Sequence, residues 1–240
     1  MSQCPVGEAM IICGGDEAGR GAVLGPLTVS IVAVKKSNER KLAEIGVRDS
    51  KLLRPEQREL LFKKINKLAQ EVLISHISPK EINEAMQNKI SLNELEAVHF
   101  SRLLDKVQSE VSTVYLDSPD VVQEKFGLRV NMYSQKPTAV SGKTERKKGI
   151  KYTRIIAEHK ADATYPVVSA ASIMAKVSRD EAIRQLSIKL GIKLGSGYPS
   201  DYKTMEVVRR NLKNPEFKAQ LREHWSTVDN IKQARIASFV

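Results

Sequence analysis

The sequence contains few cysteines and few aromatic residues, and it has no apolar run long enough to span a membrane. Its two cysteines, Cys4 and Cys13, form no CxxC pair, so the spacing predicts neither a zinc site nor a disulfide framework. Two free thiols are typical of a reducing compartment. Because the first residues also lack the pattern of a signal peptide, we expect a cytoplasmic protein.

Acidic residues are in the minority. The 240-residue chain has 39 Lys and Arg residues against 28 Asp and Glu residues, which gives a formal net charge of +11 at pH 7. A charge of this sign favours polyanionic partners such as nucleic acid or an anionic membrane surface. The sequence shows no internal repeat, long linker or coiled-coil heptad, so we expect a monomer with one large domain or one domain and an appendage.

Short β-branched runs alternate with longer helical patterns, which predicts an α/β fold with a mixed sheet. The predicted strands are residues 9–13, 24–34, 71–77, 111–116 and 154–158, with 128–132 as a short extra strand. The predicted helices are residues 55–69, 91–107 and 167–190, and a short helix that begins at 78–81. Beyond residue 195 the pattern is polar and helical, which predicts a small C-terminal appendage.

The rest of the chain is organised around the stretch GGDEAGRG at residues 14–21. Asp16 and Glu17 follow the first predicted strand after two glycines. Since neighbouring residues of a strand point to opposite faces, both carboxylates can serve one site only if the strand ends or bulges there. Carboxylate oxygens are the ligands that hard divalent cations prefer. A solvated turn is the alternative interpretation of the same residues.

Two further carboxylates follow predicted strands. Asp117 comes at the end of strand 111–116, and Asp162 lies between strand 154–158 and the long helix. If all four acids converge, bound cations would relieve their repulsion. Two Mg²⁺ ions about 3.5–4 Å apart could then activate a water and stabilise the leaving oxygen of a phosphoryl displacement, with Asp16 bridging them. Taken singly, Asp117 could instead cap a turn and Asp162 a helix.

Several segments, in this order, together resemble type 2 ribonuclease H (ribonuclease HII) in its archaeal and eukaryotic-like form. They are DEAGRG at 16–21, DSK at 49–51, YLDS at 115–118, HKAD at 159–162, PVVSAASI at 166–173, AKVSRD at 175–180 and GSGYPSD at 195–201. The resemblance implies a ribonuclease H-like catalytic domain over 1–194, with a mixed five-stranded sheet flanked by helices. It assigns 195–240 to a C-terminal helical appendage.

The resemblance also implies an activity. Members of this family hydrolyse the RNA strand of RNA–DNA hybrids and incise duplex DNA on the 5′ side of a single embedded ribonucleotide, leaving 3′-hydroxyl and 5′-phosphate ends. The matched catalytic and metal-binding carboxylates are Asp16, Glu17, Asp117 and Asp162. The cofactor implied is Mg²⁺ or Mn²⁺, with two ions in the active complex.

Substrate contacts follow from the same resemblance. The backbone of Gly19, Arg20 and Gly21 is expected to approach the ribose, where the missing Cβ atoms of the glycines allow a close contact. The ring of Tyr198 is expected to pack on that sugar and its hydroxyl to bond the 2′-hydroxyl, the group that distinguishes RNA from DNA. An ordinary half-buried tyrosine is the alternative.

Further candidate contacts are weaker. The phosphate contacts expected from the match are Lys51, Lys176 and Arg179, and Ser172 is expected to orient backbone or phosphate. Solvated helix faces are the alternative for the basic residues. We expect structural roles for His159 and Trp225.

The C-terminal residues 233–240, QARIASFV, resemble the sliding-clamp-binding peptide, in which Qxx[ILM]xx precedes two aromatic residues. Here the last residue is valine. Such a tail would offer Gln233, Ile236 and Phe239 to a clamp. The alternative is the end of a last helix that packs on the domain.

Three other functions can be weighed against a ribonuclease. The segment PTAVSGKT at 137–144 resembles a P-loop, but Pro137 replaces its first glycine, so we interpret it as a mobile basic loop near nucleic acid. A nucleic-acid-binding module without catalysis would gain nothing from four acids that repel phosphate. A transposase or resolvase of the wider superfamily is disfavoured by the GRG and Tyr198 match.

Overall fold

The computed structural model describes residues 10–47, 53–140, 143–144 and 147–237. Its centre is a mixed sheet in the order β3-β2-β1-β4-β6-β5. The strands are β1 (Ile11–Ala18), β2 (Leu27–Lys35), β3 (Glu71–Ile77), β4 (Val111–Asp117), β5 (Thr138–Val140) and β6 (Thr153–Glu158). The pairs β1–β2 and β2–β3 are antiparallel, whereas β1–β4, β4–β6 and β5–β6 are parallel.

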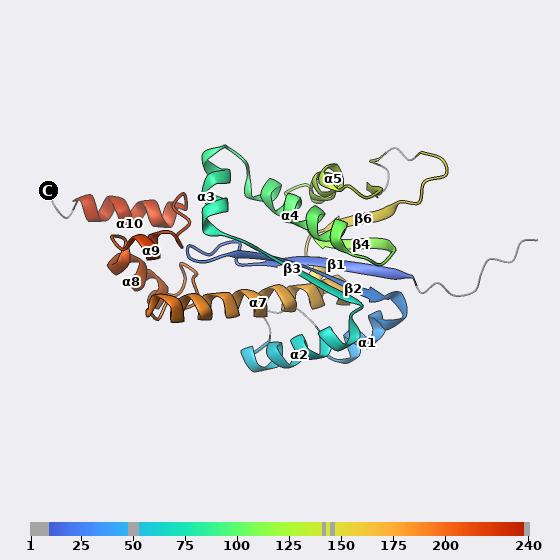
Figure 1. Cartoon of the computed structure of the whole chain (residues 1–240), viewed down its shortest axis with the longest axis horizontal. Coiled ribbons are helices and arrows are strands. Elements are labelled where there is room, and N and C mark those ends of the chain that lie inside the picture. The colour runs from blue at the N-terminus through green and yellow to red at the C-terminus, as the bar shows by residue number, and fades with distance from the viewer. Residues whose placement is uncertain (1–9, 48–52, 141–142, 145–146, 238–240) are drawn as a thin grey trace, which may run out of the picture.

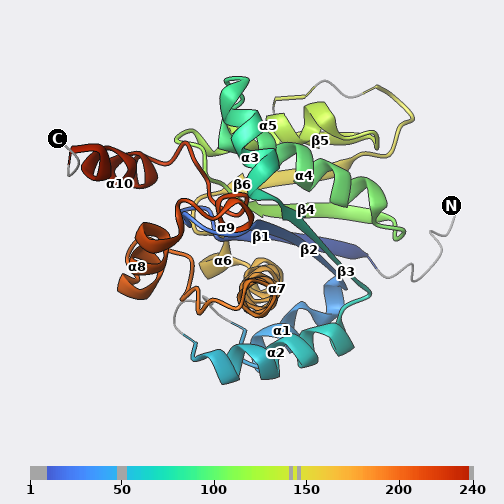
Figure 2. The ribbon, with the colours of Figure 1, turned by 60° about the vertical axis from the view of Figure 1, so that its left-hand side comes forward.

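Helices cover both faces of this sheet (Figure 1). The helices are α1 (Glu39–Glu44), α2 (Pro55–Leu68), α3 (Pro79–Gln87), α4 (Leu92–Lys106), α5 (Gln123–Tyr133), α6 (Ala161–Thr164), α7 (Pro166–Leu190), α8 (Tyr202–Asn211), α9 (Pro215–Lys218) and α10 (Ser226–Ala237), with a 3-10 turn at Lys36–Asn38. Helices α3, α4 and α5 lie on one face, and α1, α2 and α7 lie on the other (Figures 1 and 2). No helix in the described ranges is long and apolar enough to cross a membrane.

Alternate residues of β1 contribute to two apolar clusters on opposite faces of the sheet, with Cys13 in one and Ile12 in the other. The two glycines that follow bring both helical layers close to the strand. A Cβ on Gly14 would lie 2.3 Å from the backbone of Val167 in α7, and one on Gly15 would lie 2.9 Å from the ring of Phe100 in α4. The strand is therefore clamped between α7 and α4 immediately before Asp16.

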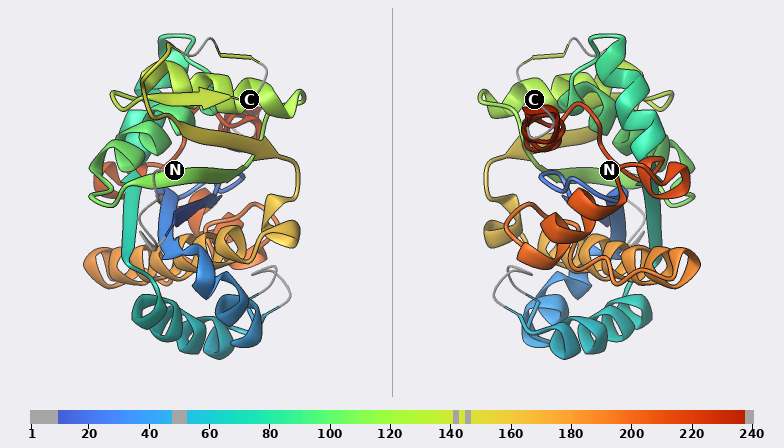
Figure 3. Two further views of the ribbon diagram at one scale, coloured as in Figure 1. Left: turned by 90° about the vertical axis from the view of Figure 1, so that its right-hand side faces the viewer. Right: turned by 90° about the vertical axis from the view of Figure 1, so that its left-hand side faces the viewer.

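A third apolar cluster joins the C-terminal segment to the rest of the chain. Val23 and Leu24 from the β1–β2 connection pack there with Phe217 and Leu221, and half-buried Trp225 packs against the cluster. The predicted helical character beyond residue 195 is confirmed by α8, α9 and α10, and the packing role expected for Trp225 is confirmed. These helices lie at the end of the sheet where the β1–β2 connection runs (Figure 3, right).

The predicted mixed α/β architecture is confirmed, with one strand more than the five expected. The strand predicted over 128–132 is wrong, because these residues belong to α5, whose buried Phe126, Gly127 and Val130 recur at helical spacing. The sixth strand, β5, falls within the segment predicted to be a mobile loop. Its three residues are buried and pair with β6, so this part of the segment is not a loop.

Candidate active site

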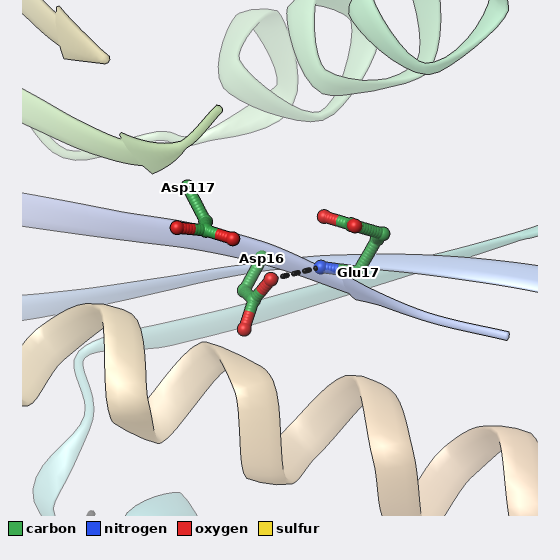
Figure 4. A group of neighbouring side chains, drawn as sticks. All are labelled: Asp16, Glu17 and Asp117. Carbon is green, nitrogen blue, oxygen red and sulfur yellow. Dashed lines mark hydrogen bonds between the residues drawn. The ribbon is translucent and has the colours of Figure 1, made fainter. Parts of the chain in front are cut away.

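The carboxylates lie where β1 separates from β4. Parallel pairing between the two strands ends at Gly15 and Leu116, whereas β1 stays paired with β2 as far as Ala18. From the sequence, we expected both carboxylates to share one site only if β1 ended or bulged at Asp16. In the structure the strand does neither there. Instead, its edge towards β4 is open there, and side chains from both of its faces can reach that opening. Figure 4 shows the Asp16 side chain directed towards α7 and Glu17 directed away from it.

Three of the four predicted acids form one group. Asp16, Glu17 and Asp117 each offer an oxygen atom, and these atoms lie within 4.8 Å of one another. Burial, and secondly the Glu17 carboxylate, raise the pKa of Asp16 well above its usual range. Burial and then Asp117 raise the pKa of Glu17. The group therefore resists carrying its full negative charge without a compensating cation.

The donor set fits a hard divalent cation. All three side chains offer carboxylate oxygens, the ligands that Mg²⁺ and Mn²⁺ prefer. Within the described residues, Glu17 Oε2 is buried and has no hydrogen-bond partner, which is costly unless a ligand satisfies it. Asp162 lines the same pocket and is 9% exposed, but it lies outside the group of three.

Hydrogen bonds fix the orientation of two of these acids. The backbone N–H of Glu17 donates to Asp16 Oδ1 at 2.7 Å, and that of Ala161 donates to Asp117 Oδ1 at 2.8 Å. A hydrogen bond between the Ser172 side chain and Asp16 partly offsets the rise in its pKa. Ser172 therefore orients a carboxylate in this structure.

Most of the predicted site residues meet in one pocket of about 330 Å³. It is lined by Asp16, Glu17, Ala18, Gly19, Arg20, Gly21, Asp117, Asp162, Ser172, Lys176 and Tyr198. Lys51 and Phe239 lie outside the described residues. The expected structural role of His159 agrees with its Nε2 lying 2.7 Å from the carbonyl oxygen of Asp120.

Arg179 is not placed as expected for a phosphate contact. Its side chain is wholly buried and donates two hydrogen bonds of 3.1 Å to the carbonyl oxygen of Ser196. Its guanidinium carbon lies 4.5 Å from the centroid of the Tyr198 ring. The structure therefore favours a supporting role for Arg179 next to the Tyr198 ring over the phosphate contact expected from the sequence. Lys176 lines the pocket, and its ammonium lies 2.6 Å from Asp180 Oδ1.

Two residues of α4 complete the site and were missed from the sequence. Arg20 Nη1 lies 2.5 Å from both carboxylate oxygens of Glu96, and its Nη2 donates to Asn93. Burial, followed by the Glu17 charge, raises the pKa of Glu96 well above its usual range. The Asn93 side chain in turn donates to Asp120 Oδ1 at 2.5 Å. A signal existed, because Glu96 is an acidic residue among apolar positions of the predicted helix 91–107.

Known proteins match this chain over most of its length. The sequence model of the family "Ribonuclease HII" matches residues 13–228. The chain belongs to the ribonuclease HII family. A ribonuclease HII from Methanosarcina barkeri is 39% identical over 226 residues, covering 93% of this chain and 96% of the relative.

Solved structures agree with this assignment. The ribonuclease H2 of Pyrococcus horikoshii superposes with a TM-score of 0.79 at 38% identity, covering 94% of this chain and 98% of that one. A ribonuclease HII from Archaeoglobus fulgidus, solved in a complex with PCNA, has a TM-score of 0.76 at 35% identity, covering 92% and 97%. Like its family, this ribonuclease HII is a metal-dependent hydrolase that cleaves the RNA strand of RNA–DNA hybrids.

Proposed function

We propose that this ribonuclease HII also incises duplex DNA on the 5′ side of a single embedded ribonucleotide. The observation that carries the proposal is the common pocket, in which the acid group, the Gly19–Gly21 backbone and Tyr198 face the same space. A site that reads one 2′-hydroxyl next to its hydrolytic centre needs only one ribonucleotide. The products would carry 3′-hydroxyl and 5′-phosphate ends.

The acids would hold two divalent ions, with Asp16, Glu17 and Asp117 as the core of the site and Asp162 at its rim. When bound, Mg²⁺ or Mn²⁺ ions supply an activated water and stabilise the charge of the leaving oxygen. The protein contributes the placement of the oxygens. Asp16 is oriented by the Glu17 N–H and by Ser172, and Asp117 by the Ala161 N–H, so little reorganisation is needed when substrate binds.

The glycines next to the acids support recognition of the sugar by the backbone. Gly21 lines the pocket, and a Cβ on it would meet no atom within 4 Å, so the backbone there is open to a close approach. Arg20 lies between the two glycines, and its side chain is held by Glu96 and Asn93. Tyr198 lines the same pocket, and a ring there can pack on a ribose while its hydroxyl bonds the 2′-hydroxyl.

The basic residues around the pocket would contact the phosphates. Lys176 lines the pocket and Lys51 remains part of this proposal from the sequence. Each such contact would weaken as salt rises, since phosphate binding releases counterions. We also propose that the enzyme works as a monomer in the cytoplasm.

The first experiment is cleavage of a DNA duplex carrying one ribonucleotide, with Mg²⁺, with Mn²⁺ and with EDTA, by the wild type, Asp16→Asn and Tyr198→Phe. We expect incision on the 5′ side that needs metal and is lost in Asp16→Asn. Tyr198→Phe should lose more activity on this duplex than on a long hybrid. Cleavage of the long hybrid alone would refute the single-ribonucleotide proposal, and tight salt-sensitive binding without any cleavage would favour a binding module.

We further propose that the C-terminal residues Gln233, Ile236 and Phe239 bind a sliding clamp. The relative from Archaeoglobus fulgidus was solved with PCNA, and Gln233 is exposed on α10 here. A pull-down with a clamp protein should recover the full-length chain and lose a chain truncated before Gln233. Equal recovery of both would refute this proposal, provided that both cleave a long hybrid equally well.

A further inference from the structure

Two arginines that lie outside the pocket are wholly buried next to it. Arg179 comes from α7, and Arg222 follows α9. A buried guanidinium is costly unless its donors are satisfied. Arg179 donates to the carbonyl oxygen of Ser196, two residues before Tyr198. Arg222 donates through Nη1 to the carbonyl oxygen of Arg20 at 2.9 Å, and through Nε to that of Gly25 at 3.2 Å.

These carbonyl groups belong to two loops that meet each other. One is the β1–β2 connection, residues 19–26, and the other is the loop at residues 195–201. Both Val23 N–H and Leu24 N–H donate to the carbonyl oxygen of Gly197, at 2.9 and 3.3 Å. The two loops thus form one backbone-bonded unit, with the glycines that face the pocket at one end and Tyr198 at the other.

Arg179 fills the space next to both loops. Gly19 has a φ of +94°, and a Cβ there would lie 2.3 Å from Arg179 Nε. Gly197 has a φ of +82°, and a Cβ there would lie 2.8 Å from Arg179 Nη2. The guanidinium therefore contacts both loops at positions where only glycine fits, and it lies against the Tyr198 ring as well.

Arg222 bonds the first of these loops through its side chain and its backbone. Its backbone N–H donates to the carbonyl oxygen of Val23 at 3.0 Å, and Gly25 N–H donates to that of Gln220 at 3.0 Å. Leu24 and Leu221 form an antiparallel bridge. Residues 220–222 therefore run beside the first loop as a short paired segment, with the Arg222 guanidinium over the Trp225 ring at 5.2 Å.

The two arginines carry like charges in a buried place. Arg222 Nη2 has no hydrogen-bond partner among the described residues, and burial and the Arg179 charge lower the pKa of Arg222 to about 9. Apolar side chains of similar volume would avoid this cost. What the arginines supply in exchange is a fixed set of donors for carbonyl groups on both loops.

We propose that Arg179 and Arg222 are positioning residues that set the distance and orientation between the Gly19–Gly21 backbone and Tyr198. This inference rests on the proposed role of these two elements in reading the ribose. If the two elements must hold one sugar between them, a small shift of either misplaces the scissile phosphate relative to the acids. A misplacement of about 1 Å can cost on the order of 100-fold in rate. If such a shift changes the alignment of the bound duplex more than its affinity, kcat should fall while KM changes little.

The test compares Arg222→Lys and Arg222→Met with Val228→Ala. Lysine keeps the charge but lacks the planar fork that reaches two carbonyl groups, and Val228 is buried in the third apolar cluster without bonding either loop. We expect kcat to fall about tenfold or more in both Arg222 variants with KM changed less than about threefold. Val228→Ala should lose thermal stability and keep its kcat below its melting temperature.

A double variant separates positioning from general damage. If Arg222 acts through the placement of Tyr198, the loss in Arg222→Met/Tyr198→Phe should be close to the larger single loss, since residues that act as a unit are not additive. Additive losses, or a kcat loss that Val228→Ala matches, would overturn the proposal.

Two readouts keep this test distinct from the proposed function. Each assay is run on the single-ribonucleotide duplex and on a long hybrid. If the wild type cleaves only the long hybrid, the single-ribonucleotide proposal is refuted. The role of the arginines can then still be tested on the long hybrid. Hydrogen exchange without substrate is the second readout. Exchange in residues 19–25 and 196–198 should accelerate in Arg222→Met and not in Val228→Ala, and unchanged exchange would overturn the positioning role.

Discussion

Arg20 and Glu96 form an ion pair in which a single guanidinium nitrogen lies 2.5 Å from both carboxylate oxygens, and Glu96 is wholly buried. The pair ties the loop after β1 to the first turns of α4. It also places a cation next to Glu17, where it lowers the pKa of that acid against the larger effect of burial. Arg20 thus serves the acid group through its side chain while its backbone faces the pocket.

Removing Glu96, the acidic partner, should therefore lower the stability of the fold. Glu96→Ala leaves Arg20, whose side chain is 33% exposed, without its charged partner, and we expect a loss of about 1–3 kcal/mol in the free energy of unfolding. Urea denaturation measures it. Glu44→Ala, which breaks an exposed pair with Arg40, is the matched control and should cost less than about 1 kcal/mol. Similar losses in the two variants would show that the buried pair contributes no more to stability than the exposed pair.

Without metal, the buried acid group should make the stability of the fold depend on pH. Because burial raises the pKa of Asp16 above its unfolded value of about 3.9, its favourable contribution is present below that value and is lost as pH rises through the folded pKa. In EDTA, Asp16→Asn should therefore be more stable than the wild type at neutral pH, by roughly 0.5–2 kcal/mol, and the gap should close towards pH 4. Thermal melts across pH measure it. A gap independent of pH would contradict the assignment.

Metal binding should separate the group of three acids from Asp162. A cation that binds only the folded state raises its stability by about 2.7 kcal/mol at a concentration 100 times its Kd. Glu17→Gln should lose most of this gain at low Mg²⁺, whereas Asp162→Asn should keep more of it, because Asp162 lies outside the group. Melting temperature against Mg²⁺ and Mn²⁺ concentration measures both. An equal loss in the two variants would place Asp162 in the same first site.

The two glycines that flank Arg20 give a matched pair of substitutions. Gly19→Ala should destabilise the fold by more than about 1 kcal/mol, because its φ is positive and the new Cβ would meet Arg179. Gly21→Ala should leave the melting temperature almost unchanged, since its Cβ would meet open space. If the ribose occupies that space, turnover of both substrates should still fall strongly. Unimpaired cleavage by Gly21→Ala would show that the sugar lies elsewhere.

Much of the sheet could be predicted from local patterns. Strand β3 and helices α2, α4 and α7 follow apolar spacing and end signals such as the Ser91 cap. The predictions failed for α5 and β5, because short apolar runs in residues 128–132 and 138–140 do not reveal their partners. Pairing with β6 and packing on Ile155, both distant in sequence, decide these two segments.

The residues of the site also divide into those that local sequence patterns predict and those that they do not. Asp16, Glu17 and Asp117 follow strands and stand in compact motifs, so the sequence sufficed to propose them. The roles of Glu96 and Arg222 depend on contacts that span 76 and 202 residues, which no local pattern contains. The guanidinium of Arg179 was assigned to a phosphate because a motif gives the residue type and not the direction in which the side chain points.

The pairing of residues 220–222 with the loop after β1 has a consequence for synthesis of the chain. The acids of β1 are made about 200 residues before Arg222, but the loop beside them cannot take its final shape until residue 222 has been added, since Arg222 supplies two of its bonds. Contacts of such long sequence separation form late in folding. A nascent chain can therefore assemble its sheet while the loop after β1 still lacks these bonds, and the loop reaches its final shape only after residue 222 has been added.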